Sequence, residues 1–148
     1  MNGRTGSEPR LLFPGLSSFY ATAPELWYPL VRVIAGGSML YHGWAKLMGG
    51  VAPVATSMVR NAIPVPSASA YIVMFLETVG AACLVLGLFT RFFAAALAIE
   101  LAVIAFYVQM PQGFARMEMC LIWGTIMAFI ALRGGGAYSL DRVIGKEL

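Results

Sequence analysis

Charged residues are scarce in this sequence, and their scarcity decides the class of protein. Only 11% of the 148 residues are Asp, Glu, Lys or Arg, while 59% are hydrophobic. A soluble domain has about 25% charged residues, so this chain lacks the polar groups needed to cover its surface. The mean hydropathy of +0.78 agrees with that conclusion. The composition predicts an integral membrane protein, and the length predicts a single domain.

Other absences exclude several chemistries. The chain has one histidine and two cysteines, with no HExxH, ExxH or CxxC motif. We therefore expect no zinc or di-iron site, no bis-histidine haem and no intrinsic cofactor. Cys83 and Cys120 lie at different predicted depths, about 20 and 7 Å below the outer surface, so both thiols should be free. The net charge of +3 is spread along the chain, so nucleic acid is not expected as a partner.

Four hydrophobic segments have the length of a membrane span. They cover Leu26–Met48, Ala70–Phe89, Phe92–Met110 and Ala115–Leu132. The connections between the last three are short turns, so these three spans should run antiparallel as neighbours. The sequence thus predicts an all-α fold, an integral membrane four-helix bundle that contacts the lipid bilayer.

Two further short helices are predicted outside the spans. The loop 49–69 is too apolar for a flexible linker, and Pro53 is suited to the first turn of a helix. We expect a short interfacial helix at Pro53–Ala62, between spans one and two, and another that starts near Ser139.

The distribution of Lys and Arg predicts the orientation. An even number of spans puts both termini on one side, and six basic residues lie on that side against three on the other. Because the cytoplasmic side carries the excess, both termini should be cytoplasmic. The six are Arg4, Arg10, Arg91, Arg133, Arg142 and Lys146, and the three are Lys46, Arg60 and Arg116. The predicted regions are a cytoplasmic or interfacial segment (1–25), the four-span domain (26–133) and a cytoplasmic tail (134–148).

Ionisable side chains inside the spans should face the bundle interior and pair, because each is costly in lipid. At 1.5 Å per residue, Arg32 and Glu100 lie roughly 9 and 13 Å from the cytoplasmic edge. The simplest interpretation is a structural ion pair between them, and a catalytic role is the alternative. One stripe of the first span should face inward, with glycines that allow close approach. It consists of Arg32, Gly36, Met39, Gly43 and Lys46.

A second group of polar residues gathers in the outer half of the membrane, where we predict a polar pocket. Its candidate residues are His42, Lys46, Glu77 and Glu118. His42 and Lys46 are about 40° apart around the first span, and Glu77 is about 6 Å deeper than His42. Gly43 would give the backbone clearance. The alternatives are that Lys46 only reaches toward headgroups and that His42 is satisfied by Ser38 or a carbonyl.

The third span carries a stripe of small residues suited to helix contact. The stripe consists of Ala94, Ala98, Ala102 and Ala105. If Glu100, on nearly the opposite face, points into the bundle, the stripe faces outward and would bind a partner helix. The alternative is that the stripe packs on a bundle neighbour and Glu100 finds its partner at the side.

Three stretches, in this order, resemble the DoxX family of small bacterial four-helix membrane proteins. They are "LVRVIAGGSMLYHGWAKL", "FLETVGAACLVLGLFTR" and "GAYSLD", and the resemblance runs from about Val31 to Asp141. It implies a multi-pass protein of the bacterial inner, or cytoplasmic, membrane that is tied to redox work. Relatives are named for a subunit of a terminal quinol oxidase. A related class exchanges disulfides through a CxxC motif, which this chain lacks.

Two functions follow as hypotheses. The first is a quinone-linked or redox-associated membrane subunit of a larger oxidoreductase assembly, whose electrons come from a partner redox subunit. In it, His42 donates a hydrogen bond to the quinone, Glu77 and Glu118 carry protons, and Lys46 gives electrostatic support. The second is a non-catalytic membrane anchor or stabilising subunit of a multi-subunit membrane complex. Whether any turnover occurs, and thus whether the protein is an enzyme, stays open.

Overall fold

The computed structural model describes residues 11–146, and all regular structure in that range is helical. The predicted all-α fold is therefore confirmed. The main rods are built from α1 (Ser17–Gly49), α3 (Pro66–Phe75), α4 (Ala81–Leu86), α5 (Thr90–Val103) and α6 (Phe114–Arg133). The elements outside these rods are η1 (Pro14–Leu16), α2 (Val51–Arg60), η4 (Met110–Gln112) and α7 (Leu140–Ile144). Two π-helical turns, η2 (Leu76–Gly80) and η3 (Ile104–Gln109), join α3 to α4 and extend α5.

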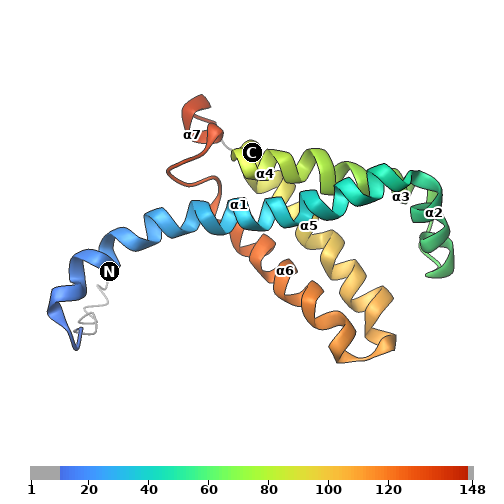
Figure 1. Ribbon diagram of the computed structural model, residues 1–148, viewed down its shortest axis with the longest axis horizontal. Coiled ribbons are helices and arrows are strands. Elements are labelled where there is room, and N and C mark those ends of the chain that lie inside the picture. The colour runs from blue at the N-terminus through green and yellow to red at the C-terminus, as the bar shows by residue number, and fades with distance from the viewer. Residues whose placement is uncertain (1–10, 147–148) are drawn as a thin grey trace, which may run out of the picture.

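The helices form two antiparallel pairs. The α3–η2–α4 rod runs alongside α1, and α5 packs against α6. In Figure 1 the second pair runs obliquely across the first, and the N-terminal part of α1 projects beyond the other helices. The crossing differs from the parallel rods that the sequence suggests, so the four-helix bundle packing is not confirmed.

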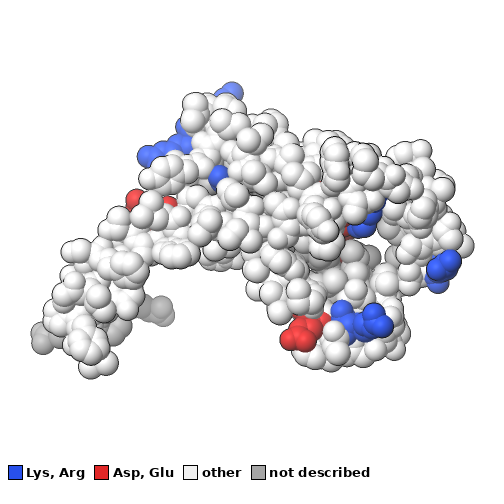
Figure 2. All heavy atoms as spheres, viewed as in Figure 1, with Lys and Arg blue, Asp and Glu red and all other residues white. Residues whose placement is uncertain are grey.

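Few charged side chains lie on the face of the molecule that Figure 2 shows. Among the described residues, three helices are long and apolar enough to cross a membrane. They are Pro66–Leu86, Thr90–Gln112 and Phe114–Arg133, close to the last three predicted spans. The first predicted span is part of the 33-residue α1, which starts at Ser17 rather than at Leu26 and contains Pro24 and Pro29. It is not among the three, because Arg32, His42 and Lys46 lower its hydropathy.

The short helices occur near their predicted positions. The helix expected at Pro53–Ala62 is present as α2. The helix expected near Ser139 is α7, and the Ser139 hydroxyl caps it by accepting a hydrogen bond from the Arg142 amide at 3.3 Å. Arg4 and Arg10 lie outside the described residues. The cytoplasmic placement of both termini and the three regions 1–25, 26–133 and 134–148 stay predictions.

Glycines set the distance between α1 and the α3–η2–α4 rod. A Cβ added at Gly43 would lie 2.3 Å from the backbone oxygen of Glu77, and one at Gly36 would lie 3.1 Å from that of Ala81. Both glycines are buried on the α1 stripe that the sequence places inward. Their lack of a side chain brings α1 directly against the turn that holds Glu77.

Candidate functional site

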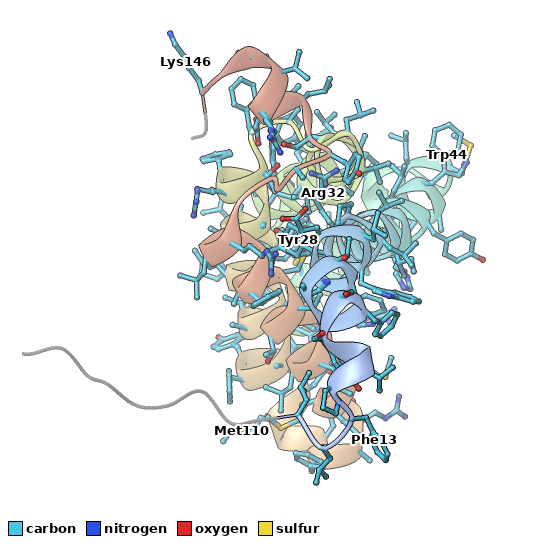
Figure 3. The ribbon with its side chains drawn as sticks, turned by 90° about the vertical axis from the view of Figure 1, so that its left-hand side faces the viewer. Phe13, Tyr28, Arg32, Trp44, Met110 and Lys146 are labelled. Carbon is cyan, nitrogen blue, oxygen red and sulfur yellow. The ribbon has the colours of Figure 1, made fainter. Side chains whose placement is uncertain are left out.

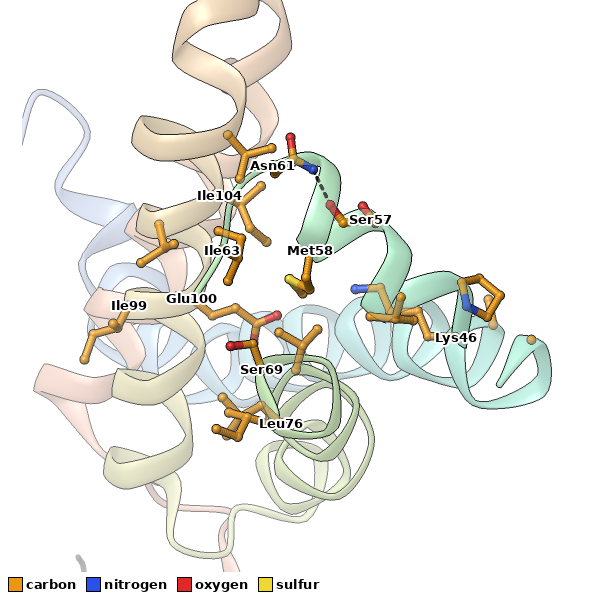
Figure 4. A pocket seen from close by; sticks show the side chains of 18 of the residues that line it. Lys46, Ser57, Met58, Asn61, Ile63, Ser69, Leu76, Ile99, Glu100 and Ile104 are labelled. Atoms are coloured by element: carbon orange, nitrogen blue, oxygen red, sulfur yellow. Dashed lines mark hydrogen bonds between the residues drawn. The ribbon is translucent and has the colours of Figure 1, made fainter. Parts of the chain in front are cut away.

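A cavity of about 720 Å³ lies between the C-terminal end of α1, helix α2, helix α3 and the α5–η3 rod. Its walls are mostly aliphatic, and α2 forms one side of it (Figure 4). The apolar lining includes Val54, Met58, Ile72, Leu76, Ile99 and Ile104. Two charged side chains, Lys46 and Glu100, also line it. We call this cavity the pocket.

Lys46 is held in place by Glu77. The Lys46 Nζ atom lies 2.5 Å from both carboxyl oxygens of Glu77, a two-pronged ion pair. The Glu77 residue is only 5% exposed, whereas about a third of the Lys46 side chain is accessible. Glu77 sits in the π-helical turn η2, and such turns are frequent at functional sites. Because Gly43 lets α1 touch this turn, the pair joins two elements at their closest approach.

Glu100 is the unpaired polar group of the pocket. Both of its carboxyl oxygens are buried, and neither has a hydrogen-bond partner among the described residues. The charged groups that act on it are Glu77 and Lys46, and the Glu77 carboxyl group is also close enough to share a proton with Glu100 through a side-chain hydrogen bond. Figure 4 shows its side chain reaching from α5 into the space between α2 and α3. The pocket is therefore lined by one ammonium group and one carboxyl group, and the Glu77 carboxylate lies behind them, paired with Lys46.

Most of the other polar side chains of the pocket are engaged by nearby backbone. The Asn61 amide nitrogen donates to the Ser57 carbonyl at 2.9 Å, and the Ser69 hydroxyl donates to the Pro64 carbonyl at 2.8 Å. These bonds leave Lys46 and Glu100 as the groups best placed to meet the polar end of a bound molecule. A mostly apolar cavity with a few convergent polar groups is the usual form of a small-molecule site.

A second charged cluster lies at the middle of α1, against the C-terminal segment (Figure 3). The Arg32 guanidinium donates to the carbonyls of Gly135 and Tyr138, the latter at 2.6 Å, and Arg32 is only 2% exposed. The Tyr28 hydroxyl donates to the Gly134 carbonyl, and the Arg133 guanidinium stacks 4.3 Å above the Tyr28 ring. We call this group the arginine cluster.

Asp141 completes the arginine cluster by capping α5. Its two carboxyl oxygens accept hydrogen bonds from the Phe89 and Thr90 amides, at 2.7 and 2.9 Å. These amides belong to the "GLFTR" stretch, and Asp141 ends the "GAYSLD" stretch, so the two motifs meet here. Gly87 has a φ of +70°, and a Cβ on it would lie 2.2 Å from the Arg32 guanidinium. Sequence reasoning missed the role of Asp141, although Ser139 and Asp141 together are typical of a helix start.

The DoxX family model matches residues 28–110, more than half of the chain. This chain belongs to the DoxX family. No curated protein and no solved structure matches it. The family and the three apolar helices together identify a membrane protein in contact with lipid. The matched residues contain Lys46, Glu77 and Glu100, whereas Glu118 and Asp141 lie beyond them.

Of the four residues predicted to share a polar pocket, this DoxX protein brings only Lys46 and Glu77 together. His42 is exposed, and its ring packs edge-on against that of Tyr41 with centroids 5.9 Å apart. It points away because the next residue, Gly43, faces Glu77, and consecutive side chains are about 100° apart around a helix. Glu118 is exposed on α6, which contributes no residue to the pocket. The pocket composition predicted from the sequence is corrected accordingly.

The predicted ion pair between Arg32 and Glu100 is not formed. Arg32 binds the C-terminal segment, and Glu100 lies beside Lys46 and Glu77. The predicted depths of Arg32 and Glu100 in the membrane assume that the spans are parallel. Because α5 runs obliquely to α1, two residues at the same predicted depth need not lie close together. The sequence predicts that 134–148 is a separate tail, whereas Gly135 and Tyr138 of this region accept the hydrogen bonds of Arg32.

The alanine stripe lies mainly inside the protein. Ala94 and Ala105 are fully buried, and Ala98 lies beside Gly124 of α6. Only Ala102 is exposed. Most of the stripe is therefore covered within the protein, and Ala98 is the member placed against α6; whether the stripe binds a partner helix stays a prediction. Cys83 and Cys120 are free, as predicted, and the described residues contain no group of three or more metal ligands.

Proposed function

We propose that this DoxX protein is a redox-associated subunit of the bacterial cytoplasmic membrane whose pocket binds the headgroup of a quinone. The observation that carries the proposal is the 720 Å³ aliphatic cavity with Lys46 and Glu100 on its floor. Ligand sites typically measure about 300–1,000 Å³ and fix an apolar molecule with a few polar groups. A membrane quinone has this character, an apolar body with two carbonyl oxygens.

The charges of the pocket support a proton-exchanging role. One proton on Glu100 makes the group of Lys46, Glu77 and Glu100 neutral, and a neutral carboxyl group can donate to a quinone carbonyl. Reduction of a quinone to a quinol needs two electrons and two protons. The electrons would come from a partner subunit with its own redox centre. Glu100 would supply one proton and the solvent the other, while the Lys46 ammonium stabilises the negative charge that develops on the ring oxygen.

The residue roles differ from those inferred from the sequence. His42 and Glu118 are exposed away from the pocket, so neither enters the proposal. Glu77 acts as a positioning residue, because both of its oxygens are engaged by Lys46. Glu100 takes the proton-carrying role, since it lines the pocket and, unlike Glu77, accepts no hydrogen bond from Lys46.

A pair of matched tryptophan substitutions tests whether the pocket binds quinone. Ile104 lines the pocket, whereas Ile122 is exposed on α6. Binding of a short-chain ubiquinone analogue to the protein in lipid nanodiscs should be lost in Ile104→Trp, because the larger ring fills the cavity. It should be unchanged in Ile122→Trp.

Native purification provides the second measurement. Mass spectrometry of the protein purified gently from its membrane should find quinone at near-stoichiometric amounts together with a redox partner subunit. Retained partner subunits without quinone, and no difference between the two tryptophan variants, would instead support the non-catalytic anchor.

A further inference from the structure

The charges on the floor of the pocket do not balance. Lys46 gives both of its measured hydrogen bonds to Glu77, which leaves Glu100 without an opposite charge of its own. An isolated carboxylate in an apolar membrane site is strongly disfavoured. Glu100 must therefore either hold a proton or be paired with a cation that enters from outside the protein.

The polar groups around Glu100 favour an incoming donor. Once Glu100 is ionised, both of its oxygens are hydrogen-bond acceptors, and its carboxyl neighbour Glu77 is then an acceptor as well and cannot donate to it. The nearby Asn61 and Ser69 side chains donate to backbone carbonyls instead. An ammonium group would supply the missing hydrogen bonds and the missing positive charge together.

The aliphatic walls of the pocket indicate the chemical character of the part of the ligand that carries no charge. The cavity is lined by aliphatic side chains of α2, α3 and α5, and the Glu100 side chain reaches into the space between them (Figure 4). A small inorganic cation would leave these walls uncovered and would lose its water shell without enough ligands to replace it. An organic cation with an alkyl or aryl body covers them and keeps its charge beside Glu100.

We propose that the pocket also binds an amphiphilic organic ammonium ion, which takes the place of a proton on Glu100. The protonated carboxyl group releases its proton to the solvent, and the carboxylate that remains pairs with the ammonium of the ligand. Charge is conserved because one proton leaves for each cation bound. Lys46 stays paired with Glu77 throughout, and these two residues are the other charged groups that face Glu100.

Calorimetric titration of the purified protein in dodecyl maltoside micelles with octylammonium tests this exchange. Protein-free micelles give the baseline, and octanol is the neutral ligand of equal chain length. We expect saturable octylammonium binding, no comparable binding of octanol, and release of about one proton per cation, measured from two buffers of different ionisation enthalpy. Affinity should rise with pH by up to about tenfold per unit, because the proton and the cation compete for one group.

Two glutamate-to-glutamine substitutions separate this site from a surface effect. Glu100→Gln should weaken octylammonium binding at least about tenfold and abolish proton release, because the amide carries no charge. Glu118→Gln, the same change at an exposed position outside the pocket, should leave both unchanged. If Glu100→Gln does not fold, proton release by the wild-type protein still decides the question.

Octylammonium binding that is independent of pH, releases no proton or survives Glu100→Gln would overturn the inference. Quinone binding in the same preparation is judged separately, by the Ile104→Trp and Ile122→Trp pair. A protein that binds quinone but not octylammonium contradicts only the cation site, and the reverse result contradicts only the quinone proposal.

Discussion

Helix α1 packs a basic side chain against another element at two places, and the surroundings of the two side chains differ in kind. Arg32 is enclosed by the C-terminal segment, where two backbone carbonyls accept its hydrogen bonds, and it does not line the pocket. Lys46 is paired with Glu77 beside a large cavity, and the adjacent Glu100 has no partner. The arginine cluster has the features of a structural clamp, and the pocket has those of a binding site.

The comparison of Arg32 with Lys46 limits what can be inferred from an ionisable residue inside a membrane protein. A charge inside a membrane protein is commonly taken as a sign of function. Here, Arg32 is the more deeply buried of the two basic residues, yet its guanidinium ties α1 to the loop that follows α6. What distinguishes the pocket is that the Glu100 carboxyl group has no hydrogen-bond donor and lies beside the cavity. The burial of a charged side chain does not distinguish it, because Arg32 is buried as well. The two clusters should therefore respond differently to substitution, one in stability and the other in ligand binding.

The largest loss of stability is expected from Asp141→Ala, in the arginine cluster. The change removes two charge-assisted hydrogen bonds to the buried start of α5, each worth roughly 1.5–3 kcal/mol. Unfolding in mixed micelles should show a loss of about 3–5 kcal/mol. Arg142→Ala, at the exposed neighbouring position, should change stability by less than about 0.5 kcal/mol. If the folded Asp141→Ala protein also lost ligand binding, the proposed separation of the two clusters would be wrong.

Gly43→Ala should have the next largest effect, because it acts on the contact that brings Lys46 to Glu77. The added Cβ would lie 2.3 Å from a backbone oxygen of Glu77, so the two helices must move apart. Overpacking of this kind costs about 1–3 kcal/mol, and ligand binding in the pocket should weaken as well. Gly37→Ala is the matched control, since a Cβ there meets no atom within 4 Å. Equal thermal stability of the two variants in detergent would contradict a close helix contact at Gly43.

The sequence predicted the local features of the fold better than its contacts. Hydropathy located three of the spans, proline and serine positions marked α2 and α7, and glycine spacing identified the inward stripe of α1. The prediction that Arg32 pairs with Glu100 is wrong. The surroundings of these two residues depend on the angle at which α5 crosses α1 and on a loop that is distant in sequence. The π-helical turn that carries Glu77 also leaves no trace in hydropathy, although it sets the direction of that side chain.

Removing first Lys46 and then Glu77 should show that the two side chains do not contribute independently to the free energy of unfolding. Lys46→Met leaves a buried carboxylate without its partner, which should cost about 1–3 kcal/mol. Lys46→Met combined with Glu77→Leu removes both charges and should recover part of that loss. Octylammonium binding should decrease in the double variant much less than in Glu100→Gln, because Glu100 remains. Additive losses of unfolding free energy would show that the two side chains do not interact as the structure indicates.

The smallest effect is expected at His42, and it tests the pocket boundary directly. The sequence suggests a network in which His42 and Glu77 depend on each other. In the structure His42 is exposed and turned away from the pocket, so His42→Ala should change the unfolding free energy by less than about 0.5 kcal/mol.

The cycle of His42→Ala, Glu77→Gln and the double variant separates the two interpretations. Independent sites add to within about 0.3–0.5 kcal/mol, and that is the result the structure predicts. A coupling energy above about 1 kcal/mol would place His42 inside the network after all. The His42 ring packs edge-on against Tyr41, so Tyr41→Ala serves as the control: it removes that contact and should leave octylammonium binding unchanged, as should His42→Ala.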